Sequence, residues 1–363
     1  MVQPIRGDMD CRNKHDLGVS DCLLELAGEK AMLVIEALNS HQATAFECDT
    51  LVKYSLTYEN TLYMDSPVTT VISYPFERVS CHPNLPSNPF ADLFKALWIL
   101  SGSERINSLG RYGQNDLRQT DDGIILQGAY GFRVREHFSL VGEPEGYGPP
   151  IDQLKSVIAL FQTDMRRRDC VIQLWDAGID LGLDSRNLPE ATQLYFTVRA
   201  SGYLDLMVSY RECDVLQASS DRVAFSMIQS FIADSLGIRV GRYWQVIQTL
   251  RANKFLLEEM KYVAERRGDN FYDNDYVEPP LMDTESHSWL ADLDMFIDEG
   301  QVLGMRSSFF KNVAGPMGQA WDMYSRGPGL ATANLIEAQK IVTSVRAKDW
   351  RRAASLWLEA RNV

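Results

Sequence analysis

One stretch of the chain restricts its fold more than any other. Between residues 191 and 250, two strand-like runs are followed by a long apolar helix and a third strand-like run. The strand-like runs are ATQLYFTVRA (191–200), YLDLMVSYREC (203–213) and RYWQVIQTL (242–250), and the helix is RVAFSMIQSFIADSLGI (222–238), ending near Gly237. Strands and helices mixed in this way predict an α+β fold.

The rest of the chain extends this mixture. The segment ADLFKALWILSG (91–102) places Leu93, Ala96, Leu97 and Leu100 on one helical face, and Gly102 would end that helix. Further helices are predicted over 22–38 and 151–164, and strands over 51–64, 69–76 and 170–175. From about Thr284 the sequence becomes helical in pattern, and it is rich in Trp and Ala. We therefore expect a main domain at 1–283 and a helical C-terminal extension at 284–363.

The charge of the chain limits its partners. Lys and Arg number 36 against 49 Asp and Glu, the formal net charge is −13, and no basic block occurs. Nucleic acid is therefore not an expected partner. No apolar run reaches the length of about 18 residues that spans a membrane, and the opening MVQPIRGDMDCRNKHD is too polar for a signal-peptide core. These features predict a cytoplasmic protein without a membrane partner.

Common catalytic and metal-binding motifs are missing from the sequence. The six cysteines show no CxxC pair, so we expect free thiols rather than a zinc site or a disulfide framework. No histidine occurs from Phe138 to Ser286, which removes histidine chemistry from the middle of the chain. The sequence also lacks a P-loop, a GxGxxG after a strand, a GxSxG elbow and an HExxH motif.

Two short segments allow a functional and a structural interpretation. Arg166, Arg167 and Arg168 could clamp a phosphate, or they could form the solvated end of a helix. The segment Gly128-Ala129-Tyr130-Gly131 could line a site, or it could be a plain turn. The residues alone leave both alternatives open.

Six segments, read in order, resemble the thymidylate synthase superfamily, which includes pyrimidine nucleotide hydroxymethylases. They are NPFADLFKALWILSG (88–102), DDGIILQGAYGFR (121–133), RRRDCVIQLWDA (166–177), LPEATQLYFTV (188–198), YRECDV (210–215) and GRYWQV (241–246). The resemblance covers roughly residues 75–283, with 1–75 only weakly matched, and the tail looks like that of a long-tailed, phage-like branch. It implies a mixed sheet packed by helices and 5,10-methylenetetrahydrofolate as cofactor.

The resemblance also implies that the usual nucleophile is replaced. In this family a Pro-Cys motif supplies a thiolate that adds to C6 of the pyrimidine. Here Glu190 follows Pro189 at that place, and Gln193 stands near a position usually held by His. Lys95 replaces a carboxylate of the helix motif, whereas Tyr130 is kept. By resemblance, Glu190, Lys95 and Tyr130 are the expected catalytic residues, and Gln193 is expected to bind substrate.

The predicted substrate contacts depart from the family in a consistent direction. Arg211 is kept at the phosphate site, but the next residue is Glu212 instead of Ser. The arginine pair that the family donates across a dimer appears as Arg168 followed by Asp169. A carboxylate at 4 Å from a phosphate charge costs about 4 kcal/mol at an effective dielectric of 20. These changes disfavour a simple nucleotide monophosphate and fit a nucleoside or an amine-bearing molecule.

The remaining expected contacts concern the sugar, the base and the cofactor. The His-x-Tyr that holds the sugar hydroxyl corresponds to Arg251 and Asn253. Asp221 corresponds to the base-reading Asn if one residue is deleted before it, and an Asp there goes with cytosine, whose exocyclic amine donates to a carboxylate. Asp214 matches the family's contact to the pterin ring.

Two hypotheses follow for the function. The first is a folate-dependent hydroxymethyl or methyl transferase acting on a cytosine-like pyrimidine or a related electron-rich acceptor, with Glu190 as base or cation-binding group and Lys95 as acid. The second is a non-catalytic subunit or ligand-binding pseudoenzyme that pairs with a Cys-bearing relative in a heterodimer. In either case the resemblance implies a dimer, a homodimer under the first hypothesis.

Three structural alternatives stay open beside these hypotheses. Glu190 and Lys95 could form an ion pair in an inactive cleft. Asp221 could be the N-cap of the helix that follows it. Cys213 is expected to be an inert buried thiol rather than a displaced nucleophile.

Overall fold

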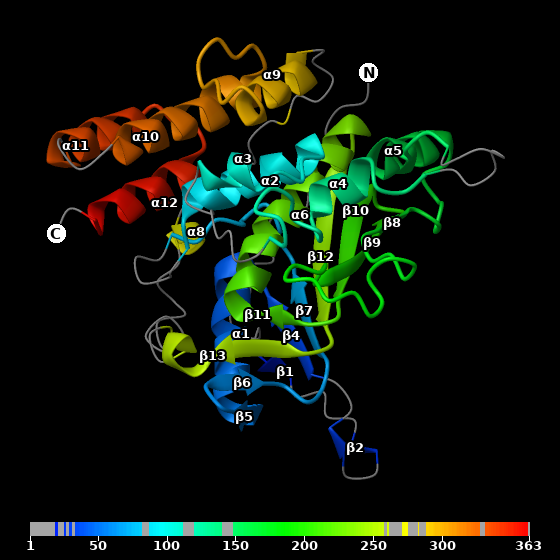
Figure 1. Cartoon of the computed structure of the whole chain (residues 1–363). Coiled ribbons are helices and arrows are strands. Elements are labelled where there is room, and N and C mark those ends of the chain that lie inside the picture. The colour runs from blue at the N-terminus through cyan, green and yellow to red at the C-terminus, as the bar shows by residue number, and fades with distance from the viewer. Residues whose placement is uncertain are drawn as a thin grey trace.

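A seven-stranded mixed sheet forms the centre of the molecule (Figure 1). The computed structural model describes residues 19–20, 25–26, 29–30, 33–81, 87–111, 120–139, 148–257, 260, 271–274, 282, 288–326 and 331–361. The order across the sheet is β1 (Val19–Ser20), β4 (Leu33–Ala37), β7 (Val68–Ile72), β12 (Arg239–Ile247), β10 (Tyr203–Tyr210), β9 (Ala191–Val198) and β8 (Val171–Gln173). β4 pairs with β7 and β10 with β12 in parallel, and the other neighbours are antiparallel. The α+β class with a mixed sheet is thus confirmed.

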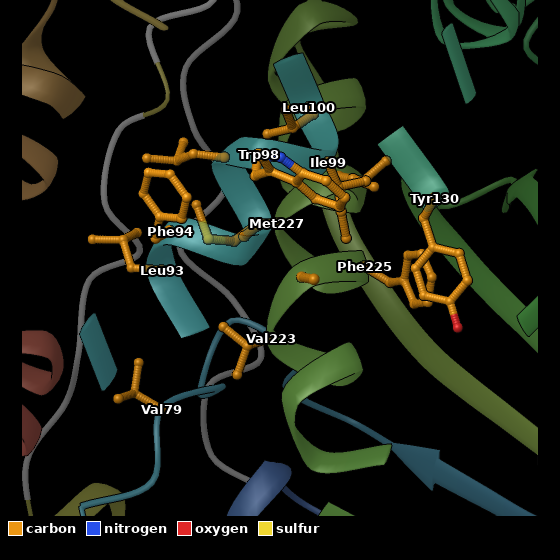
Figure 2. Close-up of a cluster of buried hydrophobic side chains, with 14 of the residues drawn as sticks. Val79, Leu93, Phe94, Trp98, Ile99, Leu100, Tyr130, Val223, Phe225 and Met227 are labelled. Atoms are coloured by element: carbon orange, nitrogen blue, oxygen red, sulfur yellow. The ribbon is translucent and has the colours of Figure 1, made fainter. Parts of the chain in front are cut away.

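The long apolar helix lies between the sheet and a second helix. α6 (Val215–Ser235) contacts β10 and β12 on one side and α2 (Pro89–Ser101) on the other, so its residues are buried almost all round. Its Gln229 Nε2 donates to the Leu204 carbonyl of β10 at 2.8 Å. Figure 2 shows Phe94 and Trp98 of α2 beside Met227 of α6, and Tyr130 next to Phe225. This double coverage explains why the sequence is apolar on every face of the helix.

The predicted helix at 91–102 has clear start and stop signals. The Asn88 side chain accepts hydrogen bonds from the backbone N–H groups of Phe90 and Ala91, and Pro89 occupies the first turn. Gly102 ends the helix in the left-handed conformation, with φ of 85°. The predicted helix at 151–164 is also present, as α5 (Gln153–Thr163).

The prediction for the N-terminal part was wrong in two places. The segment 22–38, predicted to be helical, contains β2 (Glu25–Leu26), β3 (Glu29–Lys30) and β4, while residues 22–24, 27–28 and 31–32 lie outside the described residues. The predicted strand at 51–64 begins inside α1 (Ser40–Tyr54). Within 51–64, only β5 (Leu56–Tyr58) and β6 (Thr61–Tyr63) are strands. A short apolar run such as LVIEA fits a buried strand as well as a helix.

A smaller four-stranded sheet lies beside the end of β10. Its order is β11 (Cys213–Asp214), β13 (Leu250–Asn253), β6 and β5. β11 and β13 are parallel and place Asp214 opposite Arg251. Two predicted site residues from segments far apart in the sequence are therefore neighbours.

The C-terminal segment is helical and packs on α2 (Figure 1). Its elements are α9 (Ser288–Ile297), the π-helix Phe310–Ala314, α10 (Gly315–Ser325), α11 (Ala331–Val342) and α12 (Lys348–Glu359). Phe90 of α2 contacts Trp321 and Trp357, with ring centroids 5.6 Å and 5.5 Å away. The boundary proposed at 283/284 lies outside the described residues, so the division into domains stays a prediction. None of the helices in the described ranges is both long and apolar enough to span a membrane.

Candidate active site

A cavity of about 980 Å³ lies where α2, the start of α6 and three loops meet. This volume is at the upper end of the range of about 300–1,000 Å³ for small-molecule sites. One part of the lining is apolar and includes Trp98, Ile99, Ile106, Leu109 and Leu126. Seven predicted site residues line the cavity: Lys95, Tyr130, Glu190, Arg211, Glu212, Asp214 and Arg251. The structure therefore brings most of the predicted site together.

Two backbone segments reach the cavity because a glycine lets them approach closely. A Cβ on Gly128 would lie 2.8 Å from the backbone of Leu188 and Pro189, and the Gly128 N–H donates to Asn187 Oδ1 at 3.0 Å. This contact holds the loop that ends at Glu190. The segment 128–130 lines the cavity, so the functional alternative for this turn is supported in its geometry.

Lys95 is fixed by a buried carboxylate. Its Nζ lies 2.6 Å from Asp221 Oδ1, and the two side chains are 11% and 0% exposed. Gln217 Nε2 donates to the same oxygen at 2.9 Å, and the Tyr130 hydroxyl lies 3.5 Å from Asp221 Oδ2. Asp221 thus lies beneath the cavity as the counter-ion of Lys95.

Glu190 is paired with an arginine and not with Lys95. Arg251 Nη2 lies 3.0 Å from Glu190 Oε1, and Arg251 Nε lies 3.6 Å from Glu212 Oε2. Glu212 in turn pairs with Arg211 at 2.5 Å. The proposed Glu190–Lys95 ion pair is therefore wrong, because α2 packs on α6 and brings Lys95 to Asp221 first. We call Arg211, Glu212, Arg251 and Glu190 the charge chain.

Burial shifts the pKa of several groups at the cavity, Glu190 and Cys213 among them. Desolvation raises the pKa of Glu190, and the nearby negative charge of Asp221 adds to this effect. Desolvation also raises the pKa of Cys213 well above its usual value, with Asp221 and Glu190 adding to the shift. Cys213 is fully buried, and its thiol hydrogen-bonds to Glu190. A thiol in this environment stays protonated, as expected for an inert cysteine.

The N-cap of α6 is Asp214 and not Asp221, the residue that the sequence analysis considered. α6 begins at Val215, and Asp214 is its N-cap, with a side chain that accepts from the Leu216 N–H at 3.0 Å. Asp221 lies within the helix, so the N-cap interpretation of Asp221 is wrong. Asp214 also lines the cavity, and burial raises its pKa.

Besides Asp221, three predicted substrate-binding residues lie outside the cavity lining. Gln193 donates to Gln173 Oε1 at 2.7 Å across neighbouring strands, on the sheet face opposite α6. Asn253 is exposed and accepts from the Phe255 N–H. Arg168 is exposed and donates to the carbonyls of Arg166 and Arg167. In this single chain, the arginine cluster has the geometry of a solvated segment.

Gln217 and Arg186 are among the lining residues that the sequence interpretation missed. Gln217 lies one helical turn before Asp221, and this i, i+4 spacing on the helix could have indicated it. Arg186 lines the cavity from the loop before Glu190, where its N–H donates to Asp121 Oδ1 at 3.1 Å. No pattern in the sequence singles out Arg186, because its placement depends on a contact between two loops.

The fold and the cavity define a class of protein. The family model for thymidylate synthase matches residues 93–271, which include most of α2, the charge chain and the strands that carry it. The chain belongs to the thymidylate synthase family and is a transferase of one-carbon groups.

Two phage proteins are similar to this chain. A deoxyuridylate hydroxymethyltransferase of Pseudomonas phage M6 is 32% identical over 310 residues, which cover 82% of this chain and 84% of that protein. A deoxyuridylate hydroxymethyltransferase of Bacillus phage SP01 is 29% identical over 187 residues, or 51% of this chain and 48% of that protein. The resemblance to the hydroxymethylase branch is thereby confirmed.

Proposed function

We propose that the chain transfers a hydroxymethyl or methyl group from 5,10-methylenetetrahydrofolate to C5 of a pyrimidine nucleoside or nucleotide, cytosine-like or otherwise electron-rich. The observation that carries the proposal is the cavity, which unites Lys95, Tyr130, Glu190 and Arg211 from separate matching segments. Both phage relatives are named for hydroxymethyl transfer to deoxyuridylate. The same chemistry on a pyrimidine is therefore the activity that the site supports best.

The lining of the cavity fits the proposed cofactor. Trp98, Ile99 and Leu109 offer an apolar wall for an aromatic ring system, and the Asp214 carboxylate can accept from a ring N–H. Bound methylenetetrahydrofolate supplies a one-carbon unit at the oxidation level of formaldehyde. The protein then has to orient the pyrimidine and manage its protons.

Lys95 and Glu190 supply the two polar roles that C5 substitution needs. When C5 of an intact ring attacks the one-carbon unit, positive charge develops on the ring, and the Glu190 carboxylate can offset it. The Lys95 ammonium can hold the ring in place by donating to a ring carbonyl oxygen. Asp221 holds Lys95 in place through an ion pair at 2.6 Å. The proton on C5 must then leave, and the Glu190 carboxylate is the base. Its raised pKa brings it closer to neutral pH, where a general base is most effective.

The family uses a thiolate because an ordinary pyrimidine C5 is a weak nucleophile. An acceptor with an electron-donating amino group needs less activation, which is the reason to expect a cytosine-like ring. Under this proposal Glu190 stands at the position of the family's nucleophilic Cys and acts as a base.

The proposal includes a homodimer in the cytoplasm. On the sheet face opposite α6, Trp244, Met207 and Tyr195 are partly exposed and stand side by side in register. A row of large apolar side chains on an open sheet is suited to pairing with a second copy. Arg168 would then be offered to the neighbouring cavity.

Product analysis by mass spectrometry tests the function. The full chain is incubated with methylenetetrahydrofolate and, separately, deoxyuridine, deoxycytidine and their 5′-monophosphates, with the phage M6 relative assayed in parallel. We expect at least one pyrimidine to gain a CH₂O or CH₂ unit on its ring, only when the cofactor is present. If the relative yields product and this chain converts none of the four, the non-catalytic subunit becomes the better hypothesis.

A further inference from the structure

We infer that the cavity takes its pyrimidine as an uncharged nucleoside and discriminates against a phosphate monoester, with Glu212 as the residue that sets this preference. The inference rests on the proposed function, because it concerns which form of the pyrimidine binds at the same site. It is carried by the pairing of the charged residues that line the cavity.

The charge chain alternates in sign along one wall. Its order is Arg211, Glu212, Arg251 and Glu190, with N–O distances of 2.5 Å, 3.6 Å and 3.0 Å between successive members. Two cations and two anions cancel, so the wall has no net charge. Arg211 is held further by its Nε, which donates to the Pro189 carbonyl at 3.0 Å.

A phosphate dianion would meet this wall at a disadvantage. To bind Arg211 bidentately, the phosphate would have to displace the Glu212 carboxylate, which would then lie next to the incoming negative charge. Arg251 is shared by two carboxylates, so it offers no unpaired guanidinium either. The Glu212 carboxylate thus binds Arg211 in the place where a phosphate would have to bind.

Two other cations of the described site already have partners. Lys95 is paired with Asp221, and Arg186 Nη1 donates to the Thr120 carbonyl at 3.4 Å. Arg168 lies outside the cavity lining in this chain, and Arg167 beside it is paired with Asp169. If a second copy donates Arg168, that single guanidinium would have to offset the phosphate dianion beside the carboxylates of Glu212 and Glu190.

A nucleoside finds complementary partners on the same wall. Sugar hydroxyl groups both donate and accept, and the charge chain presents carboxylate oxygens and guanidinium N–H groups in alternation. The side chains of Arg211, Glu212 and Arg251 are 36–37% exposed, so their outer atoms are open to a ligand. Hydrogen bonds from the charge chain to the sugar hydroxyls leave every ion pair of the charge chain intact.

Calorimetric titration of the full chain tests the inference. The probes are deoxyuridine, deoxycytidine, each 5′-monophosphate and inorganic phosphate, added to the wild type, to Glu212→Gln and to the matched control Glu337→Gln. Glu337 lies on α11 in an exposed pair with Lys340. We expect the wild type to bind one nucleoside about tenfold more tightly than its monophosphate. Glu212→Gln should reverse this preference by strengthening monophosphate binding and let inorganic phosphate compete, whereas the control behaves as wild type.

The possible failures are distinguishable. If the wild type prefers the monophosphate, the inference is overturned while the proposed reaction stands. If Glu212→Gln is folded, by its melting temperature, but its monophosphate affinity is unchanged, Glu212 does not set the preference. If no pyrimidine binds at all, the proposed function and the inference both fail.

Discussion

At the scale of single residues, the pairing of Lys95 with Asp221 is the feature that most changes the interpretation of the site. The Lys95 side chain is 11% exposed and that of Asp221 is fully buried, and each is the other's partner in an ion pair at 2.6 Å. The pair also fixes the direction in which the ammonium donates. Under the proposed function, Lys95 therefore stabilises the packing of α2 on α6 and also binds the pyrimidine.

Removing one partner of this pair should cost more than removing both. Lys95→Met leaves Asp221 buried without its counter-ion, and we expect a loss of about 3–5 kcal/mol in unfolding free energy. Lys95→Met combined with Asp221→Asn should recover most of that loss. Urea denaturation of the two single variants and the double variant measures the coupling. Additive effects would show that the two side chains do not interact in solution.

Asp92 makes a prediction about pH. Burial raises its pKa from 3.8 to about 6, although Ser220 donates to its Oδ1 at 2.7 Å. The folded state therefore binds this proton more tightly than the unfolded state, and the resulting stabilisation, present at low pH, is lost as pH rises through 6. Asp92→Asn should then be more stable than wild type at pH 7 by about 1–3 kcal/mol, with little difference at pH 4. Melting temperatures at both pH values are the measurement, and an equal difference at both would refute this.

At the scale of elements, the C-terminal helices hold one wall of the cavity. α3 (Ile106–Gly110) lines it through Ile106 and Leu109, but a five-residue helix has little stability of its own. The next residue, Arg111, makes two hydrogen bonds to Asp322 of α10, at 3.2 Å and 2.7 Å. Its carbonyl accepts from Trp321 Nε1 at 2.5 Å. The helical extension thus reaches the site through α3.

Asp322→Asn should loosen α3 without unfolding the protein. We expect faster hydrogen exchange at the amides of 106–110 and weaker binding of the pyrimidine, with a loss in stability of about 1 kcal/mol or less, since this ion pair is partly exposed. Lys340→Met, which breaks an exposed pair in α11, is the control and should leave exchange at 106–110 unchanged. If exchange in α3 is the same in both variants, the extension does not position the wall.

Elements with strong local signals were predicted from the sequence, and elements that depend on distant partners were not. α2 has Asn88 and Gly102 as start and stop signals, and the strands β9, β10 and β12 alternate clearly in burial. The segment 33–37 is a strand because it pairs with β1 and β7, which its own sequence cannot specify. The Lys95–Asp221 contact joins residues 126 positions apart, so only the packing of α2 on α6 determines it.

At the scale of the whole molecule, the open face of the sheet is the expected dimer interface. Trp244 lies between Val71 and Met207 in register, and Tyr195 follows on the next strand. Trp244→Glu should place a charge in the middle of this surface and convert a dimer to a monomer at micromolar concentration, because burying an unpaired charge is costly. Sedimentation equilibrium of wild type and variant measures this. A wild type that sediments at the monomer mass of 41.1 kDa would remove the interface.

The central claim is that Glu190 acts as the base in a one-carbon transferase that works without the usual thiolate, and single-turnover product formation in Glu190→Gln tests it most directly. The matched control is Cys213→Ser, which removes the neighbouring thiol but keeps a hydroxyl donor toward Glu190. We predict that Glu190→Gln keeps its fold and its pyrimidine affinity but loses at least about a hundredfold in rate, while the control retains turnover. The wild-type rate should also fall on acidification, with an apparent pKa above the ordinary 4.5 of a glutamate, because only the ionised carboxylate accepts the proton. A folded Glu190→Gln that forms product at the wild-type rate, or a Cys213→Ser that forms none, would contradict the account.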